Sequence, residues 1–200
     1  MKLALCICPQ WSIETPSFAI GSLKSHIKNN NVVVKQFDLN VQSSLYVRKI
    51  NKDLFYDWGN DKPWNSKRTF INEVLPIFKD FWNEKIEELS KYDVVCFTTY
   101  TSNIMATDYI ARYLKARNKK IQIWYGGPHS WYSDCGGLVE DGKYREFVDV
   151  ACGSNEGETI IADLVNSYEK NKNYENIKGI YRWNKMTPSF PTALPKGRSG

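Results

Sequence analysis

Five short segments rich in glycine, serine, threonine and asparagine are the parts of this sequence best suited to ligand binding. Glycine lets the backbone approach a ligand closely, and hydroxyl groups and helix N-termini donate hydrogen bonds to phosphate oxygens. Each segment follows a short apolar run, so each is expected to be a loop after a buried strand. Together on one sheet edge they would suit a nucleotide-shaped ligand, whereas any one alone would be an ordinary turn. The segments are 9–16, 38–40, 98–103, 126–130 and 153–159.

The motifs of the common phosphate and redox sites are missing from the sequence. No G-x-G-x-x-G follows the first apolar run and no G-x-x-x-x-G-K-[ST] occurs, which argues against a Rossmann dinucleotide site and a P-loop. Segment 98–103 could hold a flavin phosphate, but it follows the third apolar run, where a flavodoxin would use the first. No C-x-x-C spacing typical of zinc or dithiol redox sites occurs.

The acidic and thiol side chains are expected to be structural rather than catalytic. Glu156 and Glu158 could form an acid–base pair, but they start the last helical segment, where carboxylates interact favourably with the positive helix end and cap it. Cys6 and Cys8 point to the same side of one strand, and free cysteine packs as a small hydrophobic residue. We therefore assign no catalytic residue.

Apolar runs alternate with helical periodicity along most of the chain. The runs are nearly continuous and rich in β-branched and aromatic residues, as in parallel strands covered on both faces. The alternation predicts a doubly wound, Rossmann- or flavodoxin-like α/β fold: a five-stranded parallel sheet with helices on both faces. Ligands bind such sheets outside the carboxyl ends of the strands, where the five loops would meet. The expected strands are 2–8, 32–38, 94–98, 121–125 and 148–152.

Three further stretches carry signals for a helix start, an insertion and a late edge strand. Thr15 and Pro16 suit the N-cap and first turn of the first helix. Residues 41–90 are too long for one crossover, so we expect a helical, aromatic-rich insertion, in which Pro76 begins or kinks a helix. A late edge strand is expected at 180–183, within a single domain 1–185 that is followed by a linker or artificial tail at 186–200.

Composition and charge narrow the class of protein. The chain has 200 residues, of which 42% are hydrophobic and 24% charged, as in one globular domain. Its net charge of +5 comes from scattered lysines and arginines, which argues against a nucleic-acid partner. No apolar run is long enough to span a membrane, and no signal peptide is expected. Five cysteines without an export signal indicate a reducing, cytoplasmic setting.

The order and spacing of the loops resemble the cobalamin-binding domain that precedes the radical SAM barrel in cobalamin-dependent radical SAM enzymes. The similarity covers residues 2–185, and G-G-P-H at 126–129 with the glutamate-rich turn 153–159 is its most specific part. It implies a domain that holds cobalamin with the nucleotide tail between the sheet edge and helices. The corrin face would then meet a radical SAM domain, in a methyltransferase-type system.

The resemblance also implies roles for the loop residues. Glycines 126–127 would let the backbone pass beside the tail, hydroxyl groups of 98–102 would hydrogen-bond the tail and the corrin amides, and 153–158 would form the far wall. The residues expected to bind the cofactor are Pro9, Gln10, Trp11, Ser12, Thr15, Asp38, Asn40, Thr98, Thr99, Tyr100, Thr101, Ser102, Asn103, Gly126, Gly127, Pro128, His129, Gly153, Ser154, Glu156, Gly157, Glu158 and Thr159.

Several features depart from cobalamin-binding domains that ligate cobalt through histidine. The D-x-H-x-x-G element is absent, and the first loop has Trp11 instead of any histidine. His129 is an alternative cobalt ligand, although a histidine after Gly-Gly-Pro is expected to fix the loop by hydrogen bonding. For apolar contact with the corrin ring, the candidates are Trp11, Tyr100 and Trp131.

Radical chemistry is not expected from this chain by itself. No C-x-x-x-C-x-x-C occurs after residue 152, so S-adenosylmethionine and a 4Fe–4S cluster are expected only in a partner domain absent from this chain. Two other functions stay open from the residues alone. One is a freestanding carrier or sensor that binds a nucleotide such as FMN. The other is an interaction scaffold in which the 41–90 insertion docks a partner protein.

Overall fold

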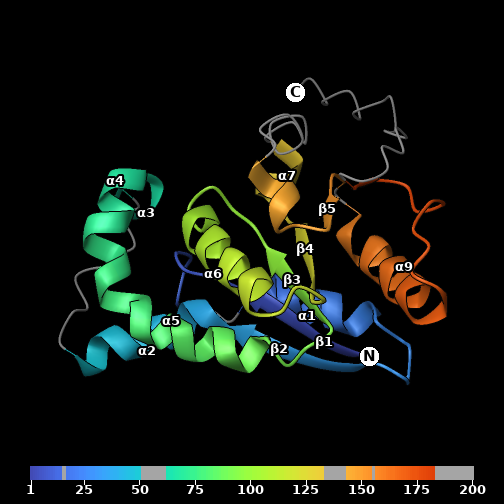
Figure 1. Cartoon of the computed structure of the whole chain (residues 1–200), viewed down its shortest axis with the longest axis horizontal. Coiled ribbons are helices and arrows are strands. Elements are labelled where there is room, and N and C mark those ends of the chain that lie inside the picture. The colour runs from blue at the N-terminus through green and yellow to red at the C-terminus, as the bar shows by residue number, and fades with distance from the viewer. Residues whose placement is uncertain (15–16, 51–61, 133–142, 155, 183–200) are drawn as a thin grey trace.

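A six-stranded sheet in the order β2-β1-β3-β4-β5-β6 forms the centre of the computed structural model (Figure 1). Strands β1 to β5 are parallel and β6 pairs antiparallel with β5, which confirms the predicted doubly wound α/β fold and its late edge strand. The structure describes residues 1–14, 17–50, 62–132, 143–154 and 156–182. The strands are β1 Lys2–Ile7, β2 Val33–Asp38, β3 Val94–Thr98, β4 Gln122–Gly126, β5 Val150–Cys152 and β6 Ile180–Tyr181.

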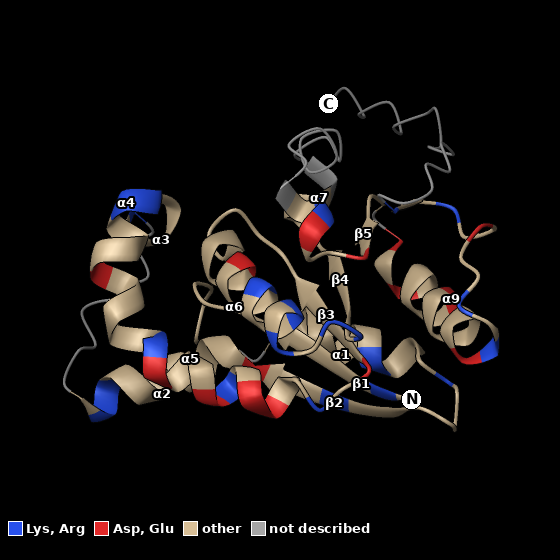
Figure 2. Ribbon diagram, viewed as in Figure 1, with Lys and Arg blue, Asp and Glu red and all other residues tan. Residues whose placement is uncertain are grey.

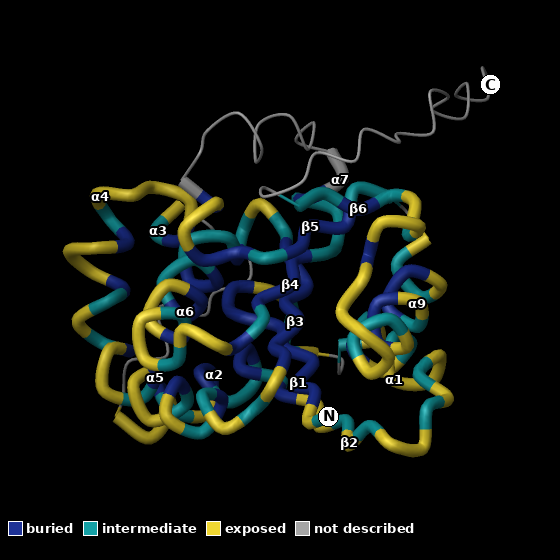
Figure 3. The backbone as a smooth tube through the Cα atoms, turned by 45° about the vertical axis from the view of Figure 1, so that its right-hand side comes forward, coloured by how far each residue is buried: buried dark blue, intermediate teal, exposed yellow. Residues whose placement is uncertain are grey.

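The helices divide between the two faces of the sheet. In Figure 3, α1 and α9 lie on one side of the strands, and α2, α5 and α6 lie on the other. For α1, α2, α5 and α6 the division follows from right-handed crossovers, because the chain moves from β1 to β2 in one direction and from β3 to β4 in the other. Helix α9 leads to the antiparallel strand β6, so this rule does not set its face. The helices are α1 Phe18–His26, α2 Leu39–Lys49, α3 Lys62–Asn65, α4 Lys67–Thr69, α5 Leu75–Leu89, α6 Ile104–Arg117, α7 Pro128–Tyr132 and α9 Gly157–Lys170, with a π-helical turn η2 at Phe70–Val74 and a 3-10 turn η3 at Lys143–Glu146.

The alternation of side chains along β1 separates two apolar cores. Leu3 and Leu5 pack on the α1/α9 face, whereas Ala4, Cys6 and Cys8 pack on the α2/α5/α6 face. The expected burial of Cys6 and Cys8 is confirmed, since both side chains are inaccessible to solvent. Burial raises the pKa of the Cys8 thiol to about 12, so this group stays neutral and apolar in character.

One predicted helix start and one predicted loop are wrong. Helix α1 begins at Phe18 with Ser17 at the N-cap, later than predicted, and Thr15 and Pro16 lie outside the described residues. The predicted loop 38–40 is not a loop, because α2 begins immediately after β2. Asp38 accepts a hydrogen bond from the Val41 amide at 2.9 Å, and this capping bond lets the strand pass directly into the helix.

The described part of the 41–90 insertion is helical and adds to the core. The aromatic rings of Trp64, Phe70, Phe78 and Trp82 pack on one another, and Trp82 donates to Ser43 Oγ of α2 at 3.1 Å. Pro76 stands in the first turn of α5, directly after η2, which confirms its predicted place at a helix start. Of the aromatic residues predicted for the earlier part of the insertion, Trp64 is described and buried, whereas Phe55, Tyr56 and Trp58 lie outside the described residues.

Surface charge and helix length are unremarkable in the described part of the chain. Figure 2 shows basic and acidic side chains intermixed along α5 and α6 rather than separated by sign. None of the described helices combines the length and the hydropathy needed to cross a membrane.

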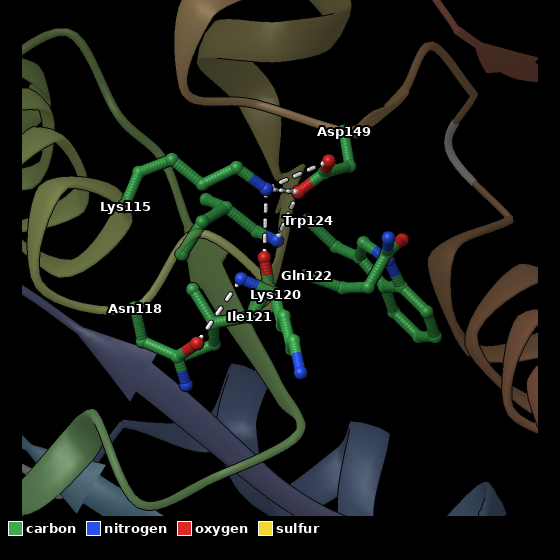
Figure 4. A network of polar contacts seen from close by, with 8 residues as sticks. Lys115, Asn118, Lys120, Ile121, Gln122, Trp124 and Asp149 are labelled. Atoms are coloured by element: carbon green, nitrogen blue, oxygen red, sulfur yellow. Dashed lines mark hydrogen bonds and ion pairs between the residues drawn. The ribbon is translucent and has the colours of Figure 1, made fainter.

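A lysine–aspartate pair joins α6, β4 and β5 at the amino edge of the sheet (Figure 4). Lys115 Nζ donates to both Asp149 carboxylate oxygens, at 2.9 and 2.7 Å, and to the Ile121 carbonyl at 2.7 Å. Asp149 Oδ2 also accepts from the Ile123 amide at 2.7 Å. The pair thus holds the start of β4 against the residue that precedes β5.

Replacing Lys115 by methionine should lower the free energy of unfolding by about 1–3 kcal/mol, because a half-buried carboxylate and a carbonyl lose their charged donor. Urea unfolding followed by circular dichroism measures the change. Lys35→Met is the matched control: it removes the exposed Lys35–Glu88 ion pair, and a clearly smaller change is expected because solvent screens exposed pairs. Equal effects in the two variants would contradict the prediction.

Candidate functional site

A cavity of about 260 Å³ opens at the carboxyl edge of the sheet between α1, α9 and the ends of β3, β4 and β5. Helix α1 packs on β1 and β2 and also against α9, so the cavity lies between this helix pair and the ends of the strands. The carboxyl-terminal parts of β3 and β4 form the floor of the cavity. The cavity is lined by Ala19, Leu23, Cys96, Phe97, Thr98, Tyr100, Trp124, Tyr125, Gly126, Gly127, Pro128, Cys152, Ser154, Gly157, Glu158, Ile160, Ile161 and Leu164.

Polar groups of the lining lie near the mouth of the cavity, and apolar groups lie deeper. Helices α1 and α9 run from the carboxyl edge toward the amino edge, so residues later in each helix are deeper. Thr98 pairs with Gly126 at the mouth, and Cys96 pairs with Trp124 one step deeper on the same face. The cavity therefore offers hydrogen-bonding groups to the outer part of a ligand and an apolar slot to the inner part.

The turns after β3 and β4 are locked together by a close backbone approach. The Thr99 amide and hydroxyl both donate to the Gly126 carbonyl, at 2.7 and 2.8 Å, and the His129 amide donates to the Thr99 carbonyl at 3.0 Å. Gly127 has φ +99°, and a Cβ at this position would lie 2.8 Å from the Thr99 oxygen. Glycine is required there both by the backbone conformation and by the available space.

The first loop presents an aromatic pair beside the cavity mouth. The rings of Trp11 and Tyr100 stack with centroids 4.1 Å apart, and Tyr100 also lines the cavity. Asn40 holds the loop from α2: it accepts from the Trp11 amide and donates to the Trp11 and Ser12 carbonyls, each at 3.0 Å. Trp11 remains 37% exposed, so the pair offers a flat apolar surface at the rim.

Buried side chains also brace the start of α6. Asn103 Oδ1 accepts from the Tyr100 amide at 2.7 Å, and its Nδ2 donates to the Thr98 carbonyl at 3.1 Å. Ser102 Oγ donates to the Gln10 carbonyl at 2.8 Å, which ties this turn to the first loop. These polar groups are thus engaged within the protein, and they position the backbone that forms the mouth.

The last loop connects α9 to α1 at the other side of the mouth. Glu158 Oε1 accepts from Ser22 Oγ of α1 at 2.9 Å, and Ser154 Oγ accepts from the Glu156 amide at 3.2 Å. The expectation that both glutamates cap α9 is wrong for Glu156, which occupies the N-cap position without a capping hydrogen bond from its side chain. Glu158 does lie in the first turn, where the helix dipole favours a carboxylate.

The walls of the cavity are nearly free of charge. Among the described residues that line it, Glu158 is the only acidic or basic one. Burial raises the pKa of the thiols of Cys96 and Cys152, and it also raises the pKa of the Tyr100 phenol, so these groups stay neutral at pH 7. No group of three or more potential metal-ligating side chains occurs among the described residues. The arrangement suits the binding of a neutral ring rather than acid–base catalysis.

The structure brings together only part of the predicted site. The predicted residues that line the cavity are Thr98, Tyr100, Gly126, Gly127, Pro128, Ser154, Gly157 and Glu158. Those that make hydrogen bonds within the protein around it are Trp11, Ser12, Asp38, Asn40, Thr99, Ser102, Asn103, His129 and Glu156. The backbones of Gln10 and Gly153 are also hydrogen-bonded within the protein. Pro9 and Thr101 in the loops and Thr159 in α9 are away from the lining. Thr15 and the side chain of Trp131 lie outside the described part.

The residues that sequence reasoning missed are mostly apolar. Their periodicity is that of an ordinary core face, so nothing in it separates a cavity wall from packing against the sheet. The small residues Ala19 and Gly157, in the first turns of their helices, are the one available cue, because they leave room at the mouth. The missed residues are Ala19, Leu23, Cys96, Phe97, Trp124, Tyr125, Cys152, Ile160, Ile161 and Leu164.

Comparison with known proteins shows the fold alone. No protein-family profile and no curated protein sequence matches the chain. Two solved structures of TsrM from Kitasatospora setae, a radical S-adenosylmethionine methyltransferase, are similar to 90% of the chain at 12% identity and a TM-score of 0.55. One contains cobalamin and a [4Fe-4S] cluster, and the other contains tryptophan substrate and a SAM analog. The chain spans 28% and 27% of those two chains, and the likeness shows a shared fold.

Gly127→Ala should destabilise the protein by about 1–3 kcal/mol, because alanine is strained at this positive φ and its Cβ would meet the Thr99 backbone. Thermal and urea unfolding measure the effect. Gly126→Ala is the neighbouring control, since a Cβ there would lie at an ordinary 3.7 Å from Cys152. The prediction fails if the two variants are equally stable.

Proposed function

We propose that this chain is the cobalamin-binding domain of a radical SAM enzyme of the methyltransferase type. The observation that carries the proposal is the cavity between α1, α9 and the carboxyl ends of β3 to β5. Its position at the ligand-binding edge of a doubly wound sheet is where a nucleotide tail would enter. The fold-level likeness to TsrM, one of whose structures contains cobalamin, supports the same assignment.

The residues present fit the parts of cobalamin. The apolar inner slot, with Leu23, Trp124 and Leu164, suits a flat and neutral base. The polar mouth, with Thr98 and Ser154, would hydrogen-bond the ribose and phosphate of the tail. The stacked rings of Trp11 and Tyr100 at the rim would contact the edge or face of the corrin.

In this proposal the protein binds and orients the cofactor. Bound cobalamin would supply the methyl-transfer chemistry. Among the described residues no cluster of thiolates is placed to hold iron, so S-adenosylmethionine and a 4Fe–4S cluster would belong to a radical SAM partner domain. The neutral walls and the internally bonded polar loops agree with a holding role rather than with acid–base catalysis.

The cavity is less suited to FMN than to a cobalamin tail. The phosphate monoester of FMN carries more negative charge at pH 7 than the phosphodiester of a cobalamin tail. Glu158, in the first turn of α9, is the charged side chain at the described mouth, so it would repel the FMN phosphate more strongly. The scaffold alternative has less support too, because Trp64 and Trp82 of the insertion are buried rather than displayed.

Titration of the chain with hydroxocobalamin should give saturable binding, with a shifted corrin absorbance and co-elution in gel filtration. Cobalamin should also raise the melting temperature, because a ligand that binds only the folded state stabilises it by mass action. FMN at the same concentration serves as the control and should do neither. A folded protein that fails to retain cobalamin, or that FMN alone stabilises, would overturn the proposal.

Ala19→Phe should weaken cobalamin binding at least about tenfold, roughly 1.4 kcal/mol, because the new ring would occupy the mouth of the cavity. Equilibrium dialysis measures the affinity, and circular dichroism checks the fold. Ala116→Phe adds the same ring to the exposed face of α6, on the other side of the sheet, and should leave affinity unchanged. Undiminished binding by the Ala19 variant would place the cofactor elsewhere.

A further inference from the structure

Hydrogen-bonding groups are distributed unevenly with depth in the cavity. Thr98, Ser154 and Glu158 lie at the level of the strand ends and the first turn of α9. Leu164 follows Glu158 by six residues, which places it about 9 Å further along the helix axis at 1.5 Å per residue. Glu158 is also held toward α1 by its hydrogen bond from Ser22, so its carboxylate lies at the mouth of the cavity and not at its inner end.

The inner end of the cavity has little to offer a polar ligand atom. Leu23, Ile161 and Leu164 present hydrocarbon. The Trp124 indole nitrogen donates to Gln122, at 3.4 Å, so its hydrogen is directed toward a residue of the protein. Cys96 contributes a neutral, buried thiol, which is a weak donor and a weak acceptor.

The chemistry of the inner end discriminates between the bases that corrinoid tails can carry. A dimethylbenzimidazole joined to ribose keeps one ring nitrogen and otherwise presents hydrocarbon. An adenine joined to ribose keeps three ring nitrogens and an exocyclic amine. Each buried polar atom without a partner reduces affinity by roughly tenfold, so an adenine tail would bind this slot much more weakly.

We infer that this cavity selects corrinoids by the base of the nucleotide tail, and that it prefers a benzimidazole to a purine. The inference rests on the proposed function, since it concerns the same site. The floor residue Cys96 and the apolar helix residues around it are the specificity determinants. The mouth contacts the parts of the tail that all these corrinoids share, and it contributes affinity without discrimination.

Three probes test the inference on the unmodified chain: cobalamin, the analogue with an adenine tail, and cobinamide, which lacks the nucleotide. Dissociation constants come from corrin absorbance and equilibrium dialysis. We expect cobalamin to bind tightest, with the adenine analogue at least about tenfold weaker and cobinamide weaker than cobalamin. An adenine analogue that binds as tightly as cobalamin would overturn the inference and leave the proposed function intact.

The other two outcomes also discriminate. Cobinamide binding as tightly as cobalamin would show that the tail does not occupy the cavity, which again overturns the inference. If none of the three probes binds to the folded protein, the proposed function itself fails. The comparison needs no variant, so it stays decisive even where a substitution prevents folding.

Two cysteine-to-serine variants, one on each face of the sheet, test which residues set the preference for cobalamin. Cys96→Ser places a hydroxyl at the cavity floor, where it would partner a purine nitrogen, and should narrow the preference for cobalamin several-fold. Cys6→Ser makes the same change in a buried cysteine on the opposite face of the sheet and should leave the preference unchanged. An unchanged preference in the Cys96 variant, or an equal change in both, would overturn the role of the floor.

Discussion

The handedness of the crossovers is the constraint on which the rest of this structure depends. Right-handed connections on the two sides of the β1–β3 switch send α1 to one face and α2, α5 and α6 to the other. Helix α9, which leads to the antiparallel strand β6, packs on the α1 face. The same parallel arrangement brings the segment that follows each strand from β1 to β5 to one edge. The cavity lies at that edge, between the α1–α9 pair and the ends of β3, β4 and β5.

Polar side chains at this edge mostly stabilise the protein rather than face a ligand. Asn40 and Asn103 hold the backbone of two loops, and Thr99 joins the turns after β3 and β4. A buried polar group must be hydrogen-bonded, so these residues make the edge rigid. Recognition then falls to shape, to the apolar slot and to the small groups at the mouth, which agrees with a ligand whose innermost part is neutral.

Aromatic side chains of the insertion pack on the face of the sheet opposite the cavity. The insertion packs Trp64 and Trp82 against α2 and the core, and the Trp82 indole is hydrogen-bonded to Ser43. Large buried rings remove much apolar surface from water, which stabilises the folded state. The insertion thus has a structural role in its described part.

The sequence by itself determined the doubly wound class, the late edge strand and the helix start near Pro76, because apolar runs, periodicity and backbone restrictions are local properties. Tertiary structure alone decided which loop residues face the cavity. Asp38 turned out to cap a helix and Asn40 to clamp a distant loop, since the partners of both were set by how the strands assembled. Tertiary structure also decided that Leu23, Ile161 and Leu164 line a cavity. A stripe of apolar residues on a helix has the same pattern whether it faces a packed sheet or an open slot, and only the spacing between the elements distinguishes the two.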